Sequence, residues 1–127
     1  MRRRWNDGAG TLRIPAGAGG GEDPAVAVPL EVAASYRARS RGLLGRDGIE
    51  GAMLLTPAGG VHTFRMRFAI DVAYLDRRCR VLAVRTMVPG RMGLPRPRSR
   101  HVLEAPAGAM ARWGLRRGVV VGIEPQG

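Results

Sequence analysis

The chain has 127 residues, a length that suits one domain with a core of moderate size. Its formal net charge is +11, and all 21 basic residues are arginines. No apolar run reaches the roughly 18 to 20 residues of a membrane-spanning helix, and no apolar stretch follows the first arginines as in a signal peptide, so we expect a cytoplasmic protein. The single cysteine, Cys79, excludes an internal disulfide.

Residues 1–24 are predicted to form a flexible tail rich in glycine and arginine. Their only large apolar side chains after the first residue are Trp5, Leu12 and Ile14. Such a segment buries too little apolar surface to offset the entropy lost on ordering. We therefore expect one α+β domain over residues 25–127. An edge strand over residues 11–15 is the alternative.

The next elements are short. Residues 26–32 are predicted to form a strand. Ser35 is the residue type that caps a helix N-terminus, so a short helix is predicted over residues 36–44, ending near Gly45. Residues 53–55 form a short apolar run that ends at Thr56 and Pro57.

The middle of the chain predicts a long extended segment and a hairpin. Residues 63–75 read as one or two strands, with Phe64, Met66 and Phe68 on one face at a period of two. Residues 76–79 are expected to turn, and residues 80–88 return as a strand. Residues 89–100 contain three prolines, two glycines and four arginines, which predicts an exposed loop.

The last third predicts a strand, a helix and a strand. Residues 101–104 are extended, and Pro106 suits the first turn of a helix that would run to about residue 113. Gly114 is the expected left-handed C-terminal cap. Residues 119–124 form a final strand. Five or six short strands with two short helices indicate a small antiparallel, β-rich α+β domain, which could close partly into a barrel.

Four segments in this order resemble a known family. They are RSRGLLGR at 39–46, GAMLL at 51–55, HTFRMRFAIDVAYLD at 62–76 and VLEAPAGAMARWGLRRG at 102–118. Together they are similar to the domain-of-unknown-function 192 family of small uncharacterised prokaryotic proteins. The resemblance spans roughly residues 28–122. It implies a small β-rich α+β fold and supplies no mechanism.

Two carboxylates, Asp71 and Glu104, are embedded in apolar runs. A charge there is costly to bury unless it is paired and hydrogen-bonded, so each is a structural bonding centre or part of a site. Asp71 could accept backbone N–H groups or pair with a basic side chain nearby. Glu104 is expected at the start of the second helix, where unpaired amides and the helix dipole favour a carboxylate.

We hypothesise that both carboxylates lie at the rim of one cleft. The favoured function is a small non-catalytic binding module whose cleft holds a small anion or an acidic peptide. The candidate ligand-binding residues are His62, Arg65, Met66, Arg67, Asp71 and Glu104.

A metal-dependent enzyme is the weakest of the alternatives. His62 and His101 could join the two carboxylates as a metal set, but the histidines lack the short spacing of a helix-borne site. We assign no catalytic residue and expect no metal and no cofactor.

An arginine-rich arc between Asp76 and Glu104 supports another function. This arc has no acidic residue, and no aromatic residue occurs between Tyr74 and Trp113. A field of one sign attracts polyanions and repels copies of the same chain, so we expect a monomer. Non-specific nucleic-acid or polyanion binding without base stacking is therefore the alternative function. The arc consists of Arg77, Arg78, Arg80, Arg85, Arg91, Arg96, Arg98 and Arg100.

Overall fold

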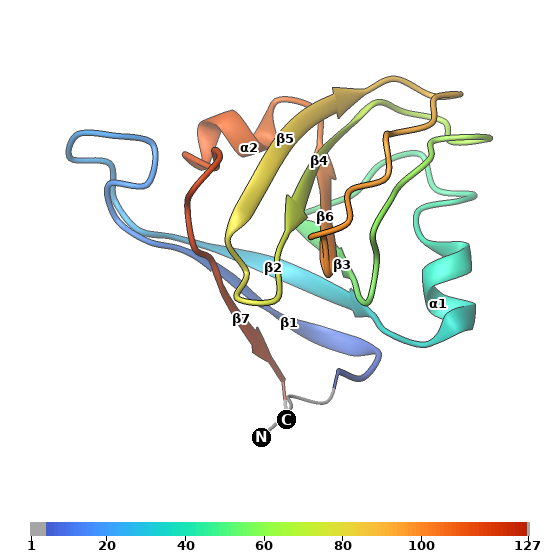
Figure 1. Cartoon of the computed structure of the whole chain (residues 1–127), viewed down its shortest axis with the longest axis horizontal. Coiled ribbons are helices and arrows are strands. Elements are labelled where there is room, and N and C mark those ends of the chain that lie inside the picture. Colours follow the sequence, from blue (N-terminus) through green and yellow to red (C-terminus); the bar gives the residue numbers. More distant parts are fainter. Residues whose placement is uncertain (1–4, 127) are drawn as a thin grey trace.

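The strands of the chain pair into one curved sheet (Figure 1), seen here in a computed structural model that describes residues 5–126. Within these residues there are seven strands, in the spatial order β5-β4-β6-β3-β2-β1-β7. β2 and β3 pair in parallel, and every other neighbouring pair is antiparallel. The strands are β1 (Gly8–Ile14), β2 (Val26–Ala33), β3 (Ala52–Leu55), β4 (Ile70–Leu75), β5 (Val81–Met87), β6 (His101–Pro106) and β7 (Gly122–Pro125).

Two short helices complete the fold. α1 (Tyr36–Arg41) lies in the connection between the parallel strands β2 and β3, and α2 (Ala109–Arg112) follows β6. The predicted cap is confirmed, because Ser35 Oγ accepts the Ala38 N–H at 3.1 Å. The helix ends at Arg41 with Gly42 as its C-cap, earlier than predicted. Within residues 5–126, no helix has the length and apolar character needed to cross a membrane.

The predicted fold class is confirmed as a β-rich α+β domain with a mostly antiparallel sheet. The sheet does not close into a barrel. At one corner, however, the chain before β7 meets the start of β5. There the Val81 N–H donates to the Val119 carbonyl at 2.8 Å, and the Val121 N–H donates to the Cys79 carbonyl at 3.0 Å.

The predicted tail is wrong at β1, which lies inside the sheet between β2 and β7. Leu12 and Ile14 are two residues apart, so both lie on its inner face, and they are 0% and 1% exposed. Asp7 also holds the chain in place, because its carboxylate accepts the Ala34 and Ser35 N–H groups at 2.6 and 2.8 Å. The alternative strand over residues 11–15 overlaps β1, but β1 has seven residues and does not lie at the edge of the sheet. Residues 1–4 of the predicted tail lie outside the described residues.

The long strand predicted from residue 63 is also wrong, because residues 63–69 form a loop and only β4 is a strand. Arg65 has a φ of 63°, which no strand contains. Thr63 is buried and fixes the loop: its hydroxyl donates to the Val88 carbonyl at 2.7 Å, and its N–H donates to the Arg91 carbonyl at 2.7 Å. The alternation of apolar residues here therefore reflects a loop packed onto the domain.

The second helix begins later than predicted. Pro106 is the last residue of β6, and the helix starts at Ala109. Gly114 has the left-handed conformation expected after the helix, with a φ of 76°. Glu104 therefore lies within a buried strand and not at a helix N-terminus.

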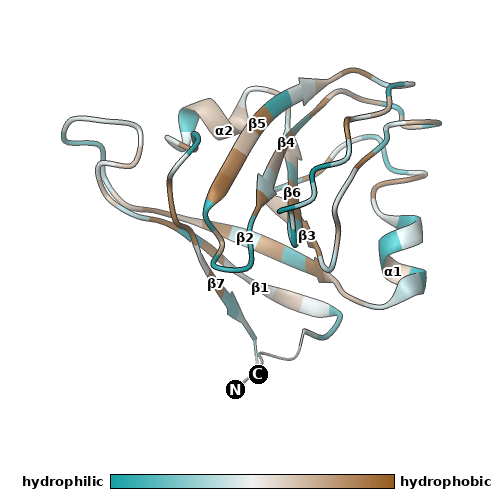
Figure 2. Cartoon of the chain, in the orientation of Figure 1, coloured by the Kyte–Doolittle hydropathy of each residue, from teal (hydrophilic) through white to brown (hydrophobic). Residues whose placement is uncertain are grey.

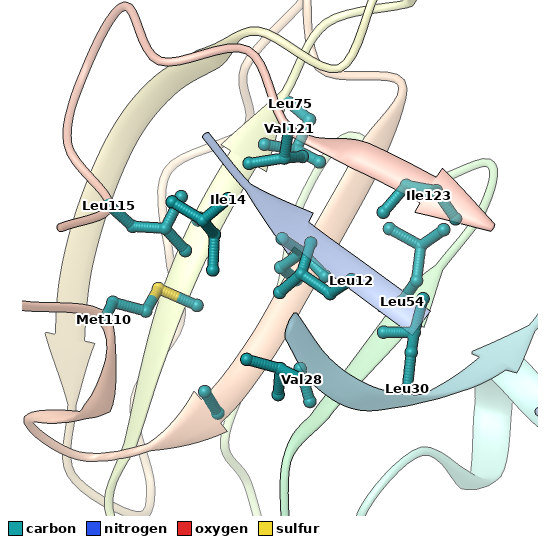
Figure 3. Packing of buried hydrophobic residues seen from close by; sticks show 14 of the residues in the cluster. Leu12, Ile14, Val28, Leu30, Leu54, Leu75, Met110, Leu115, Val121 and Ile123 are labelled. Carbon is teal, nitrogen blue, oxygen red and sulfur yellow. The ribbon is translucent and has the colours of Figure 1, made fainter. Parts of the chain in front are cut away.

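The two faces of the sheet carry two separate hydrophobic clusters. Alternate residues of β4 supply them, because Ala73 and Leu75 join the first cluster while Val72 and Tyr74 join the second. Figure 3 shows side chains of the first cluster, with Leu12 of β1 among them. Apolar and polar residues alternate along several strands, as the hydropathy colours of Figure 2 show.

Candidate functional site

Asp71 and Glu104 lie on neighbouring strands but on opposite faces of the sheet. In the antiparallel pairing of β4 with β6, Asp71 is opposite Ala105 and Val72 is opposite Glu104. Residues paired across two strands share a face, and successive residues of one strand alternate between faces. The two carboxylates therefore cannot line one cleft, and that hypothesis is wrong.

Asp71 is a structural bonding centre on the face of the first cluster. One carboxylate oxygen accepts the Thr86 hydroxyl at 2.7 Å, and the other accepts the Met110 N–H at 3.1 Å. Thr86 belongs to β5 and Met110 to the first turn of α2. Asp71 is 3% exposed, so these two bonds replace most of its contact with water.

Glu104 is buried on the other face without such partners. The residue is 4% exposed, and its carboxylate makes no hydrogen bond or ion pair with another described residue. Burial favours the neutral form of a carboxyl group and raises the pKa of Glu104 to about 7. Near neutral pH this carboxyl group is therefore divided between its protonated and charged forms.

The Glu104 side chain lines a cavity of about 120 Å³. The end of α1 and the residues after it form one wall, and the loop before β4 forms another. The floor is the face of the sheet that carries the second cluster. The lining consists of residues 39–44, Leu55, residues 60–62, Met66, Val102 and Glu104. Six of these residues have apolar side chains, and the polar ones besides Glu104 are Arg39, Ser40, Arg41 and His62, so the recess is of mixed character.

Arg39 supplies a second polar group that the sequence analysis missed. Its Nη1 donates to the Pro57 carbonyl at 3.1 Å, but its buried Nε has no hydrogen-bond partner among the described residues. Arg39 belongs to the RSRGLLGR segment, which carried the family resemblance but contained no charge within an apolar run. Only the tertiary structure brings Arg39 of α1 and Glu104 of β6 to the lining of one cavity.

The structure divides the predicted ligand-binding residues. His62, Met66 and Glu104 line the cavity together, whereas Asp71, Arg65 and Arg67 do not. Arg67 forms an exposed ion pair with Asp47 at 3.1 Å. His62 is exposed at the mouth of the cavity and stacks on Phe64, with ring centroids 5.1 Å apart.

The two histidines are not brought together either. His101 pairs with Leu75 across β6 and β4, which places its buried side chain on the face opposite Glu104. Its Nδ1 is 2.7 Å from the Thr56 hydroxyl. Among residues 5–126, no three His, Cys, Asp or Glu side chains lie close enough to hold a metal ion. The hypothesised two-histidine, two-carboxylate metal set is therefore not assembled.

The arginine-rich arc also separates into parts. Arg96 lies over the Tyr74 ring, with the guanidinium carbon 4.8 Å from the ring centroid. Arg85 donates to the Val84 carbonyl at 2.8 Å, and Arg91 is exposed near Thr63. The remaining five line one groove of about 730 Å³ at the end of the β4–β5 hairpin, and they are Arg77, Arg78, Arg80, Arg98 and Arg100.

Solved structures share this fold. A protein of Sinorhizobium meliloti 1021, solved as a candidate transcription regulator, superposes with a TM-score of 0.76 over 95% of this chain and 98% of its own, at 16% identity. A protein of unknown function from Novosphingobium aromaticivorans superposes with a TM-score of 0.74 over 88% of this chain and 83% of its own, at 21% identity. At these identities the likeness shows the fold alone.

Sequence comparison identifies the family. UPF0127 protein PH1112 of Pyrococcus horikoshii is 31% identical over 84 residues, which cover 62% of this chain and 73% of that protein. The profile of DUF192, described as an uncharacterized ACR family, matches residues 19–123. That match covers most of the chain and contains both the Glu104 cavity and the arginine groove. The chain therefore belongs to the domain-of-unknown-function 192 family.

Proposed function

We propose that the protein is a non-catalytic binding module that holds a small organic anion in the Glu104 cavity. The observation that carries this proposal is the buried Glu104 side chain, which has no partner among the described residues and lines the cavity. A buried polar group without a partner costs free energy, and a ligand that bonds to it recovers part of that cost.

The size of the cavity limits the ligand. About 120 Å³ is somewhat smaller than the roughly 150 Å³ engineered cavity that holds benzene in a well-studied lysozyme. A carboxylate with a short hydrocarbon chain suits this space, with its chain against Leu43, Met66 and Val102. A whole acidic peptide is too large, although one acidic side chain could enter.

The polar groups of the cavity favour an anion when Glu104 is protonated. A neutral carboxyl group can donate its proton in a hydrogen bond to a ligand carboxylate. Arg39 is also part of the cavity lining, and its guanidinium group places a positive charge there that favours an anion. Charged Glu104 would instead repel the anion.

Binding should therefore weaken as the pH rises through about 7, the pKa of Glu104. With that pKa, the protonated fraction falls about tenfold between pH 6 and pH 8. The apparent affinity for a short carboxylate should fall by a similar factor over this interval. The ligand's own carboxylate, with a pKa near 4 to 5 (about that of Glu), stays charged throughout.

A titration of the isotope-labelled protein with acetate, propionate and butyrate, followed by amide chemical shifts at pH 6 and pH 8, tests the proposal. Saturable shifts should appear in residues 39–44, 60–66 and 102–104. Glu104→Gln should bind almost equally at both pH values, because its amide donates without titrating. The control Asp71→Asn lies on the other face and should keep the pH dependence. Shifts that do not saturate, or that occur elsewhere, would contradict the proposal.

A further inference from the structure

The groove lined by five arginines is formed by three chain segments at one end of the sheet. The segments are residues 57–59 after β3, residues 76–80 of the β4–β5 turn and residues 97–100 before β6. Backbone hydrogen bonds fix them to one another. The Ala58 N–H donates to the Arg100 carbonyl at 2.8 Å, and the Arg100 N–H donates to the Leu75 carbonyl at 2.8 Å. The floor of the groove is therefore held in place before any ligand arrives.

The charge of the groove is not neutralised by the surrounding protein. None of the five arginines forms an ion pair with another residue in the described part of the chain. The only acidic residue in the lining is Asp76. Its Oδ1 accepts the backbone N–H groups of Arg78 and Arg80 at 2.8 and 3.0 Å, so it shapes the turn. The turn appears as a strongly hydrophilic segment in Figure 2.

We propose that this groove binds the phosphodiester backbone of a single-stranded nucleic acid. Arginine presents several N–H donors in a planar fork that fits phosphate oxygens. Five such side chains converge on one recess, where their mutual repulsion is relieved by a ligand that carries several negative charges. This site is separate from the Glu104 cavity and shares no lining residue with it.

The extent of the recess favours a chain of phosphates over a single one. A second hollow, of about 880 Å³, shares Pro57, Arg77, Arg78 and Arg100 with the groove. The two hollows thus adjoin at the β4–β5 turn, and an extended single-stranded nucleic acid is long enough to pass along both. The lining of the arginine groove contains no aromatic residue, whereas the second hollow is lined by Trp5 and also by the acidic Glu124. In the arginine groove itself, binding should therefore depend on the backbone and show little preference for base sequence.

The test uses the full chain and a fluorescein-labelled oligonucleotide of 15 thymidines, followed by fluorescence anisotropy at several salt concentrations. The test variant replaces Arg77, Arg78 and Arg98 with Gln. Arg80 is kept, because its Nη1 lies 3.5 Å from the Gly118 carbonyl. The control variant replaces three exposed arginines outside the groove with Gln, and these are Arg37, Arg112 and Arg116. Both variants have the same net charge, so only the location of the lost charges differs.

The wild-type affinity should fall steeply with salt. The test variant should bind at least about tenfold more weakly, and the slope of log K against log salt should become shallower by about 2, at about 0.7 for each lost phosphate contact. The control variant should keep the wild-type slope and lose less than about threefold in affinity. Unchanged thermal unfolding in both variants shows that the fold is intact.

Three outcomes would overturn this proposal. Equal losses of affinity in the two variants would show that net charge alone attracts the oligonucleotide. Displacement of the strand by poly-glutamate as effectively as by an unlabelled oligonucleotide would show that the groove binds acidic chains in general. Binding of tripolyphosphate at the groove without any binding of the oligonucleotide would assign the site to a small polyphosphate.

Discussion

Asp71 and Glu104 are buried to nearly the same degree on neighbouring strands, yet only Asp71 has hydrogen-bond donors for its carboxylate. Asp71 is 3% exposed and Glu104 is 4% exposed. Asp71 has a hydrogen-bond donor for each oxygen, one from β5 and one from α2. Glu104 has no such donor in the described chain and lines a cavity instead. Burial alone therefore does not distinguish a structural carboxylate from a candidate binding group, whereas its hydrogen-bond partners do.

The difference follows from what covers each face. On the face of Asp71, the β5 strand and the α2 helix approach closely enough to bring a hydroxyl and an N–H to the carboxylate. On the face of Glu104, the short α1 helix and the loop before β4 leave a recess. The first arrangement gives the carboxylate two donors, and the second leaves the Glu104 carboxyl group without a hydrogen-bond donor among the described residues.

The largest expected effect is on stability, when an apolar side chain is removed from the hydrophobic cluster on the Asp71 face of the sheet. Leu12→Ala removes a fully buried side chain of β1 and should lower the free energy of unfolding by about 2 to 5 kcal/mol. Chemical denaturation measures this loss. Leu94→Ala is the control, because Leu94 is 76% exposed and should change stability by less than about 0.5 kcal/mol. A loss at Leu12 as small as the control's would restore the flexible-tail interpretation.

The next effect is a gain in stability at Glu104. The carboxyl pKa is raised in the folded state from 4.5 to about 7, so the folded protein binds the proton more tightly than the unfolded chain. Wild-type stability should therefore fall between about pH 4.5 and pH 7, by about 3 kcal/mol at about 1.4 kcal/mol per pH unit. Glu104→Gln lacks this loss and should be more stable than wild type at pH 8, by up to about 3 kcal/mol.

Unfolding by urea at pH 4 and pH 8 measures the effect of Glu104→Gln. At pH 4 the two proteins should differ little, because both carry a neutral side chain there. A stability difference that is the same at both pH values would mean that Glu104 has a partner that holds its charge.

Asp71→Asn should lower stability, whereas Glu104→Gln should raise it. The amide cannot accept both bonds with the strength of a carboxylate, so the free energy of unfolding should fall by about 1 to 3 kcal/mol at pH 8. Combining it with Thr86→Val isolates the bond between β4 and β5. The double variant should lose less than the sum of the two single losses, because both remove the same bond. Strict additivity would show that this bond contributes nothing.

The smallest effect concerns Arg67, which was grouped with Asp71 and Glu104 by sequence alone. Its ion pair with Asp47 is exposed, so Arg67→Gln should change stability by less than about 1 kcal/mol. It should also leave carboxylate binding unchanged in the titration described above, whereas Arg39→Gln should weaken it. Equal effects of the two substitutions on binding would place the ligand outside the Glu104 cavity.

Features set by neighbouring residues could be predicted from the sequence. The cap at Ser35, the hairpin turn after Asp76 and the left-handed Gly114 all depend on residues within a few positions. The family resemblance and the β-rich fold class could also be predicted. The two embedded carboxylates could be identified as unusual because a charge within an apolar strand costs free energy to bury unless it is paired or hydrogen-bonded.

Only the tertiary structure decided which role each carboxylate has. The face of each side chain depends on strand boundaries and register, and a shift of one residue exchanges the faces. The donors of Asp71 come from Thr86 and Met110, and the cavity of Glu104 is shared with Arg39. β1 likewise belongs to the sheet through pairing with β2 and with the distant β7. These contacts join residues that are far apart in the chain, so local sequence patterns do not contain them.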